Sequence, residues 1–437
     1  MSCCIGLRRE DKNPWERRVP LIPSHIRELR EEHGLEFVVQ PSAIRVFRDE
    51  DFVREGARVQ EDLSACPVVL AVKELPDGFL ATGRTYLFFS HTIKGQAQNM
   101  PMLRRIMDLG STLIDYERIV DGQGKRLLFF GKQAGEAGMV DTLWALGQRL
   151  RLEGLDTPLS KLLQMYHYTN LVEAKEAVIR AAQGIRERGL PADLVPFVAG
   201  FLGYGHVSQG AQEVYNLLPM SEVPCHEFAS FMKRGVFSSR LVYKIVFHEH
   251  HLVRPKDPGS LFDLQEYYGH PDLYEPILEP YLRHLTVLLN GIYWTPRFPH
   301  FVSKAGLRRL FEAEAQPRLR VIGDISCDLE GGVECTLRAT DSQNPVYVYD
   351  PFTEAARTGF EGRGPVVMAV DNLPAEIALE SSIFFSQALK PLVPALARAD
   401  FGRDLEDAGL PPEIQRAVIV YRGRLTPSYA YLKEHLE

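Results

Sequence analysis

The chain has 437 residues, of which 45% are hydrophobic and 24% are charged, and its formal net charge is −7. These values exclude disordered, collagenous and low-complexity classes, and without a long basic block we expect no nucleic-acid partner. No apolar run approaches the roughly 18 residues of a membrane span, and the N-terminus shows no secretory or transit pattern. Six cysteines without a CxxC pair indicate neither a disulfide framework nor a zinc ribbon. We therefore expect a cytoplasmic protein of two or three domains with no membrane partner.

The first third of the chain alternates short apolar runs with helical patterns. A helix is predicted over Ser24 to His33, with Ser24 as its N-cap residue. Continuous apolar runs, unlike alternating ones, are typical of parallel strands covered on both faces. The predicted strands are Cys3 to Leu7, Phe37 to Gln40, Pro67 to Val72, Thr85 to Phe89, Leu113 to Tyr116 and Leu127 to Phe130.

The pattern changes after Gly131. Small and apolar residues at helical spacing predict a long connecting helix over Gly135 to Leu150, then a loop over Ser160 to Tyr168 and a helix over Leu171 to Gly184. The tail from Pro374 returns to helix. Further strands are predicted at Leu194 to Leu202, Val242 to Val246, Leu285 to Leu289, Leu319 to Ile322 and Val366 to Val370.

The simplest interpretation of this order of elements is two α/β halves with the helix around residue 140 between them. We expect an α/β fold with two Rossmann-like domains and a cleft between them. The first domain would be discontinuous, with residues 1–140 and 373–437, and would carry the substrate site. The second, residues 141–372, would bind a dinucleotide.

A glycine cluster, Gly203-Tyr204-Gly205-His206-Val207-Ser208, follows the predicted strand that ends at Leu202 and precedes a predicted helix over Gln209 to Leu217. In this context, glycines let the backbone approach a pyrophosphate at a helix N-terminus. The alternative is a strand-to-helix turn that binds no ligand. The acidic residue expected about 20 residues further on, which would grip a ribose hydroxyl, is Glu222 or Glu227.

Ionisable residues flank several predicted strands of the first domain. Lys73 and His91 each follow a strand directly, at the carboxyl end where α/β folds place ligand groups. Histidine exchanges protons near neutral pH, and arginine pairs with both oxygens of a carboxylate. A solvated surface charge is the alternative for any one of the charged residues, and a capped or core histidine is the alternative for His91; together they could form the floor of a binding cleft. The other members of this set are Arg18, Lys94, Glu117 and Arg126.

The run His248-Glu249-His250-His251 is superficially like a metal site. It is not HExxH, because Leu252 stands at the next position, and no carboxylate-rich partner set is apparent. We predict no metal site. Cys225, Cys327 and Cys335 are interpreted as ordinary buried thiols.

Several longer motifs resemble lysine–ketoglutarate reductase, the N-terminal half of bifunctional aminoadipic semialdehyde synthase, which is related to saccharopine dehydrogenase and alanine dehydrogenase. The resemblance extends in order over essentially the whole chain, so an alanine dehydrogenase-like N-terminal domain is expected. The motifs are REDKNPWERRVPLIPSHI (9–26), FFSHTIKGQ (88–96), DYERIVD (115–121), NGIYW (290–294), GDIS (323–326) and DNLPAE (371–376).

The resemblance implies an oxidoreductase that joins the ε-amine of L-lysine to the keto group of 2-oxoglutarate and reduces the imine to saccharopine. Lys73 and His91 would transfer protons and Glu117 would tune the lysine. Substrate contacts would come from Arg18, Lys94, Arg126 and Phe130. The cofactor-binding residues would be Gly203, Gly205, His206, Val207, Ser208, Glu227, Ile292, Asp324, Ile325 and Ser326.

The cofactor expected from the resemblance is NADPH, with NADH as the alternative, because the His226-Glu227 pair is kept. Alternative functions are a lysine-forming, NAD-linked saccharopine dehydrogenase, an opine-type reductase with another amine, or a non-enzymatic regulatory protein. About 60 residues follow DNLP, so saccharopine would pass to a separate oxidising enzyme. A homo-oligomer is compatible with the sequence.

Overall fold

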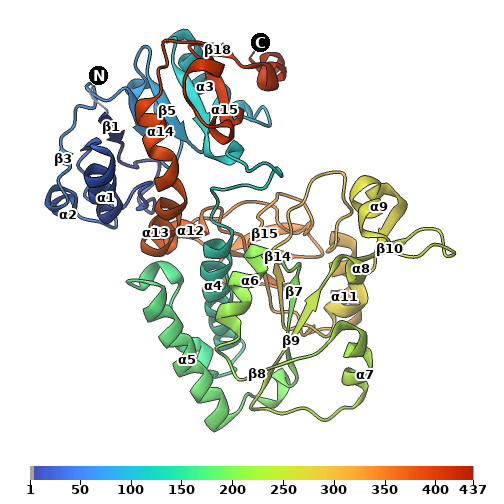
Figure 1. Ribbon diagram of the computed structural model, residues 1–437. Coiled ribbons are helices and arrows are strands. Elements are labelled where there is room, and N and C mark those ends of the chain that lie inside the picture. Colours follow the sequence, from blue (N-terminus) through green and yellow to red (C-terminus); the bar gives the residue numbers. More distant parts are fainter. Residues whose placement is uncertain (1–3, 437) are drawn as a thin grey trace. The chain divides into compact units, whose positions relative to one another are not determined.

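The structure is a computed structural model that describes residues 4–436 (Figure 1). Two compact units divide the chain, one of residues 4–130 and 378–436 and the other of residues 131–377. The boundaries predicted from the sequence are 140/141 and 372/373. The first falls inside the helix Gly131–Leu152, and the second lies just before the helix Leu373–Glu376. No helix among the described residues is long and apolar enough to cross a membrane.

The first unit contains one eight-stranded sheet with the order β18-β17-β6-β5-β4-β1-β2-β3. Strands β1 to β6 are parallel, and β17 and β18 add antiparallel neighbours at one edge. The strands are β1 (Cys4–Leu7), β2 (Glu36–Val39), β3 (Arg58–Val59), β4 (Val68–Leu70), β5 (Thr85–Phe88), β6 (Thr112–Asp115), β17 (Val418–Tyr421) and β18 (Arg424–Leu425).

The helices of this unit bury their apolar faces against the same core. In α3, Met102, Leu103 and Ile106 recur at helical spacing and are buried. The helices are α1 (Pro23–His33), α2 (Asp49–Arg54), α3 (Met100–Asp108), α13 (Ala378–Leu389), α14 (Val393–Arg398) and α15 (Pro412–Ala417).

The second unit contains another eight-stranded sheet, with the order β15-β14-β16-β13-β12-β7-β9-β8, and a separate β10-β11 pair. Strands β8, β9, β7, β12, β13 and β16 are parallel. The strands are β7 (Phe197–Leu202), β8 (Met220–Glu222), β9 (Val242–Phe247), β10 (Val253–Pro255), β11 (Tyr274–Pro276), β12 (Val287–Asn290), β13 (Val321–Asp324), β14 (Val346–Asp350), β15 (Ala355–Thr358) and β16 (Val366–Met368).

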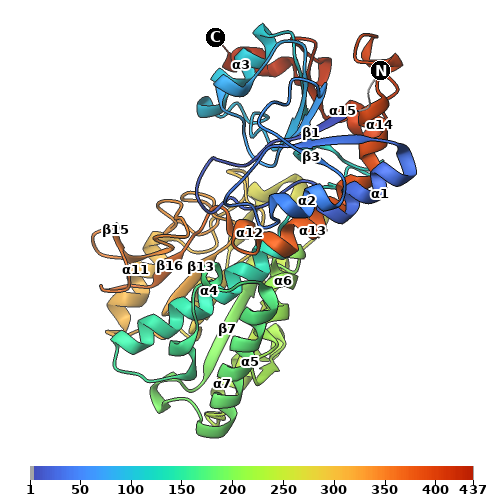
Figure 2. The ribbon, with the colours of Figure 1, turned by 90° about the vertical axis from the view of Figure 1, so that its left-hand side faces the viewer.

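Helices cover both faces of this sheet, which explains the continuous apolar character of its strands. Along β7, Phe197 and Phe201 pack into the core on the α4, α5 and α6 side, whereas Val198 packs into the core that contains α11 (Figures 1 and 2). The helices are α4 (Gly131–Leu152), α5 (Leu171–Arg188), α6 (His206–Tyr215), α7 (Phe228–Lys233), α8 (Glu249–Leu252), α9 (Leu264–Gly269), α10 (Glu279–Leu282), α11 (Lys304–Ala313) and α12 (Leu373–Glu376).

The two parallel-dominated sheets confirm the predicted α/β class, and most predicted strands and helices are present. The strand predicted over Leu127 to Phe130 was wrong: only Arg126 makes an isolated bridge, to Val120. Ser24 is not the N-cap of α1, because Pro23 takes the first helical position after Ile22. Cys3, placed in the first predicted strand, lies outside the described residues.

Candidate functional site

Three neighbouring strands of the first unit end at the same edge of the sheet. Leu70 of β4 pairs with Leu87 of β5, and Phe88 of β5 pairs with Asp115 of β6. Residues that directly follow these parallel strands therefore meet at one edge. This places Lys73, His91 and Glu117 on adjacent segments; their catalytic roles stay predictions.

His91 is held by a carboxylate that was not predicted as a site residue. Its Nδ1 lies 2.6 Å from Oε1 of Glu74, and Nζ of Lys12 lies 2.7 Å from the other oxygen of that carboxylate. Burial opposes ionisation, but the hydrogen bond from His91 and the charge of Lys12 lower the pKa of Glu74 to about 2. Glu74 is therefore an anion that orients His91, whose backbone has a positive φ of 48°. Its position directly after Lys73 was the signal available in the sequence.

A second unpredicted carboxylate holds the segment that carries Lys73. Glu10 is buried and accepts hydrogen bonds from the backbone N–H groups of Val72 (2.6 Å) and Lys73 (3.0 Å). Burial and the nearby Glu16 charge raise its pKa to about 7. Glu10 therefore fixes the backbone at the end of β4, just where the side chain of Lys73 departs.

Arg18 has a buried carboxylate partner two residues away. Its Nε lies 2.7 Å from Oε1 of Glu16 and one terminal nitrogen lies 2.6 Å from Oε2, so the pair is bidentate. The guanidinium also lies 4.5 Å from the ring centroid of Phe130, which stacks on Phe385. The structure thus brings together two predicted substrate contacts, Arg18 and Phe130, and shows that Glu16 positions the cation.

Arg126 and Glu117 form an ion pair, so two further predicted residues lie together. The backbone N–H of Glu117 donates to Asp115 (2.7 Å), a buried carboxyl whose pKa rises to about 6 because of burial. Lys94 is exposed on the segment after β5. This edge of the sheet therefore presents carboxylates and cations from several separate segments.

The second unit holds the glycine cluster at the carboxyl end of β7. Gly203 has a φ of +83°, a conformation that favours glycine, and its N–H donates to Phe247 at the end of β9 (3.0 Å). Gly205 is the N-cap of α6, so His206 and Val207 begin the helix. A Cβ on Gly210 would lie 2.1 Å from the carbonyl oxygen of Lys132. Because glycine has no Cβ, α6 can approach α4 closely at this position.

The predicted residues near the nicotinamide follow β12 and β13, the next strands across the sheet. Asp324 is buried, accepts hydrogen bonds from Asn290 (2.8 Å) and Thr336 (2.5 Å), and has a pKa raised to about 6 by burial. Ser326 donates to the carbonyl oxygen of Ile292 (2.6 Å), and Ile325 is buried. This network joins the ends of β12 and β13, so Asp324 positions the loop that follows β13.

A cavity of about 560 Å³ lies beside the glycine turn and includes Gly203, Gly205 and Ile292 in its lining. Its size lies within the range typical of small-molecule sites. Glu227 is not among the lining residues; it is exposed in the 3₁₀ helix η7 (Cys225–Glu227) before α7. Glu249, directly after the third strand of this unit, does line the cavity, and sequence reasoning missed it. The remaining lining residues are Tyr204, Leu252, Tyr267, Tyr268, Gly291, Tyr293, Phe298 and Phe301.

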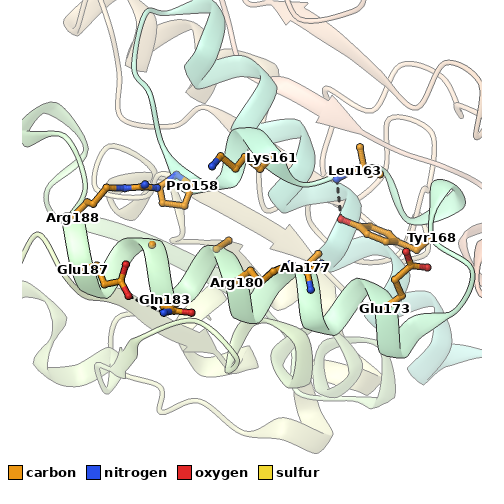
Figure 3. Close-up of a pocket in the computed structure, with 12 residues that line it drawn as sticks. Pro158, Lys161, Leu163, Tyr168, Glu173, Ala177, Arg180, Gln183, Glu187 and Arg188 are labelled. Carbon is orange, nitrogen blue, oxygen red and sulfur yellow. Dashed lines mark hydrogen bonds between the residues drawn. The ribbon is translucent and has the colours of Figure 1, made fainter.

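A second cavity of this unit, about 460 Å³, runs along α5 (Figure 3). Its lining carries both signs of charge, with Lys161, Arg180 and Arg188 near Glu173 and Glu187. No sequence-predicted site residue lines it. Among residues 4–436, no group of three or more His, Cys, Asp or Glu side chains is arranged to hold a metal ion.

Comparison with known proteins agrees with this two-unit arrangement. The family described as alanine dehydrogenase/PNT, N-terminal domain, matches residues 6–137. Alpha-aminoadipic semialdehyde synthase of Arabidopsis thaliana is 39% identical over 98% of this chain and 41% of its own length. The mitochondrial protein of the same name from Mus musculus is 36% identical over 98% of this chain and 47% of its own length. The chain thus spans less than half of these relatives.

A shorter relative, saccharopine dehydrogenase [NAD(+), L-lysine-forming] of Emericella nidulans, is 27% identical over 89% of this chain and 90% of its own length. Among solved structures, an L-alanine dehydrogenase superposes with a TM-score of 0.63 at 20% identity, covering 99% of this chain and all of that chain. This likeness supports the two Rossmann-like domains. As the sequence motifs predicted, the chain is similar over nearly its whole length to the alpha-aminoadipic semialdehyde synthases, and residues 6–137 match the alanine dehydrogenase/PNT N-terminal domain.

Proposed function

We propose that the chain is an oxidoreductase that condenses L-lysine with 2-oxoglutarate and reduces the resulting imine to saccharopine, with a nicotinamide dinucleotide as cofactor. The observation that carries the proposal is the meeting of Lys73, the His91–Glu74 pair and the Glu117–Arg126 pair at one sheet edge. The names of the relatives, alpha-aminoadipic semialdehyde synthase and saccharopine dehydrogenase, support the choice of substrates.

The charges of the first unit suit these substrates. The two acids carry three carboxylates between them, and guanidinium and ammonium groups bind carboxylates through charge-assisted hydrogen bonds. Arg18, Lys94 and Arg126 would supply these contacts. Arg18 is fixed by its bidentate pairing with Glu16 and by Phe130, so a carboxylate bound beside it would meet a cation with little freedom to move.

Proton transfer would belong to His91 and Lys73. A neutral amine must attack the keto carbon, and the carbinolamine must lose water to form the imine, so an acid and a base are needed at the reacting atoms. Glu74 holds Nδ1 of His91, which leaves Nε2 of the ring to exchange the proton with substrate. Glu10 fixes the backbone from which Lys73 extends, and Glu117 would tune the ammonium.

The cofactor would be held by the second unit. The residues fit a dinucleotide: Gly203 has the positive φ of a tight turn, Gly205 opens α6, and the adjoining cavity is of suitable size. When bound, the nicotinamide supplies the hydride that converts the imine carbon to a secondary amine carbon. The sequence-based choice of NADPH rested on the motif around Glu227, and this residue does not line the cavity.

The test is turnover by the purified chain. NADH and NADPH oxidation is followed with lysine plus 2-oxoglutarate, with each substrate omitted in turn, and saccharopine is identified by mass. His91→Ala and Lys73→Ala should cut kcat by about 100-fold or more while cofactor affinity is retained. Absence of turnover with both dinucleotides contradicts the proposal, whereas turnover with another amine only would move it to an opine-type reductase.

A lysine-forming direction is the second candidate, because saccharopine dehydrogenase [NAD(+), L-lysine-forming] matches over nearly its whole length. Assays with saccharopine and NAD⁺ as substrates decide between the directions.

Further proposals are a cytoplasmic location, tested by cell fractionation, a homo-oligomer, tested by light scattering, and a separate saccharopine-oxidising enzyme. The mouse relative is named mitochondrial, so fractionation should include that organelle.

A further inference from the structure

Glu249 stands where a dinucleotide-binding sheet places the residue that recognises the adenosine ribose. That residue follows the strand that lies next to the first strand, on the side opposite to the later strands. In this chain β7 lies between β12 and β9, so the strand in that position is β9. The end of β9 is tied to the glycine turn, because Gly203 N donates to the carbonyl oxygen of Phe247 at 3.0 Å. Glu249 comes two residues later.

The ribose-binding acidic residue does not lie at the expected interval of about 20 residues after the turn, because the order of the strands in this sheet differs from their order in the chain. The chain adds β8 and α7 between β7 and β9, and β8 occupies the sheet edge beyond β9. Glu227 lies in this added segment, so counting along the sequence leads to a residue that is not beside the turn. The carboxylate beside the turn is Glu249.

The surroundings of Glu249 suit a ribose with both hydroxyls unmodified. Its Oε1 accepts hydrogen bonds from Tyr268 (2.6 Å) and Tyr204 (3.4 Å), which hold the carboxylate at the cavity. Among the described residues that line this cavity, none is Lys or Arg. A ribose 2′-phosphate carries nearly two negative charges and is recognised by such cations, whereas a carboxylate accepts hydrogen bonds from a free 2′-hydroxyl.

The same cavity has an aromatic lining that suits a purine. Tyr267, Tyr293 and Phe298 join Tyr204 and Tyr268 there. The ring of Tyr204 stacks on His248 with centroids 4.4 Å apart, so the wall next to Glu249 is fixed. Flat apolar rings with few polar groups are the usual environment of a bound base.

We propose that Glu249 binds the adenosine-ribose hydroxyls and makes the chain prefer NADH to NADPH. The inference deepens the proposed function, and it rests on that function only in taking a nicotinamide dinucleotide as the ligand. It reverses the expectation of NADPH, because a carboxylate at this position repels the 2′-phosphate and no cation in the lining offsets the repulsion.

Binding alone tests the proposal. The purified chain is titrated with NADH and with NADPH, and nicotinamide fluorescence gives each Kd. We expect NADH to bind at least tenfold more tightly. Glu249→Gln should weaken NADH binding by about tenfold and reduce the difference between the Kd values of NADH and NADPH. Glu249→Arg should bind NADPH more tightly than NADH. Thermal unfolding of both variants should match that of the parent chain.

Two further variants serve as controls. Glu266 also accepts a tyrosine hydrogen bond, from Tyr274 at 2.6 Å, but it does not line the cavity, so Glu266→Gln should keep the preference for NADH. Tyr268→Phe removes one donor and keeps the charge of Glu249, so it should keep most of the preference.

Tighter binding of NADPH by the parent chain would overturn the proposal. A change of preference in Glu227→Gln but not in Glu249→Gln would return the role to the sequence-predicted residue. If the preference for NADH depends on Glu249 but no saccharopine forms, this inference holds and the proposed substrates are wrong.

Discussion

The imidazole of His91 and the carboxylate of Glu74 are joined by a 2.6 Å hydrogen bond between Nδ1 and Oε1. The two residues follow different strands, β5 and β4, so the bond links two neighbouring strand ends of the candidate site. Lys12 pairs with the second oxygen of Glu74, and the carboxylate is therefore ionised and fixed in place. His91 is oriented by this arrangement.

Removing the charge of Glu74 should lower turnover without weakening cofactor binding. In Glu74→Gln, a neutral amide replaces the carboxylate that holds the imidazole ring of His91, and we therefore expect kcat to fall by about tenfold or more. The Kd for the dinucleotide should be unchanged, since the glycine turn belongs to the other unit. Glu74→Asp should recover part of kcat. Equal losses in kcat and in cofactor affinity would indicate a folding defect instead.

The buried Glu16–Arg18 pair should contribute more to stability than an exposed ion pair. Glu16→Ala leaves a buried guanidinium without its bidentate partner and should lower the free energy of unfolding by about 3 kcal/mol. Glu61→Ala removes the exposed partner of Arg9 and should cost less than about 1 kcal/mol. Urea unfolding measures both variants. Similar costs for the two would show that burial does not strengthen the inner pair.

Glu10 should make stability fall between about pH 4.5 and pH 7. Its pKa is about 7 in the folded chain against 4.5 in the unfolded chain, so the folded state binds the proton more tightly. Its contribution is fully present below pH 4.5 and is lost as the pH rises through 7, by up to about 3 kcal/mol. The difference in unfolding free energy between the parent and Glu10→Gln, measured at pH 4.5 and pH 8, isolates it. A difference that does not change with pH would contradict this assignment.

The packing of α6 on α4 should tolerate no side chain at Gly210. A Cβ there would lie 2.1 Å from the carbonyl oxygen of Lys132, so Gly210→Ala should lower the free energy of unfolding by about 1–3 kcal/mol. A Cβ on Gly205 meets no atom within 4 Å, so Gly205→Ala should leave stability nearly unchanged. Chemical denaturation compares the two, and equal stabilities would show that the helices move apart at little cost.

Much of the fold could be predicted from the chain because parallel strands buried on both faces are continuous apolar runs. The run that includes Val69 and the run that includes Tyr86 mark such strands, and the motifs predicted the similarity to the alpha-aminoadipic semialdehyde synthases. The run Leu127 to Phe130 is equally apolar but is not a strand, since Phe129 and Phe130 pack against aromatic rings of α13. An apolar run indicates that a segment is buried, whereas its contacts with neighbouring segments decide which backbone conformation it adopts.

The sequence by itself determined which residue types stand at the ends of the strands: Lys73, His91 and Glu117 in one unit, and the glycine turn in the other. Only the tertiary structure decided their partners. Glu74 meets His91 because β4 and β5 are neighbours, and Glu249 replaces Glu227 beside the turn because β9, not β8, lies next to β7. Sequence spacing measures distance along the chain, whereas the order of strands in a sheet depends on packing between distant segments, which spacing does not encode.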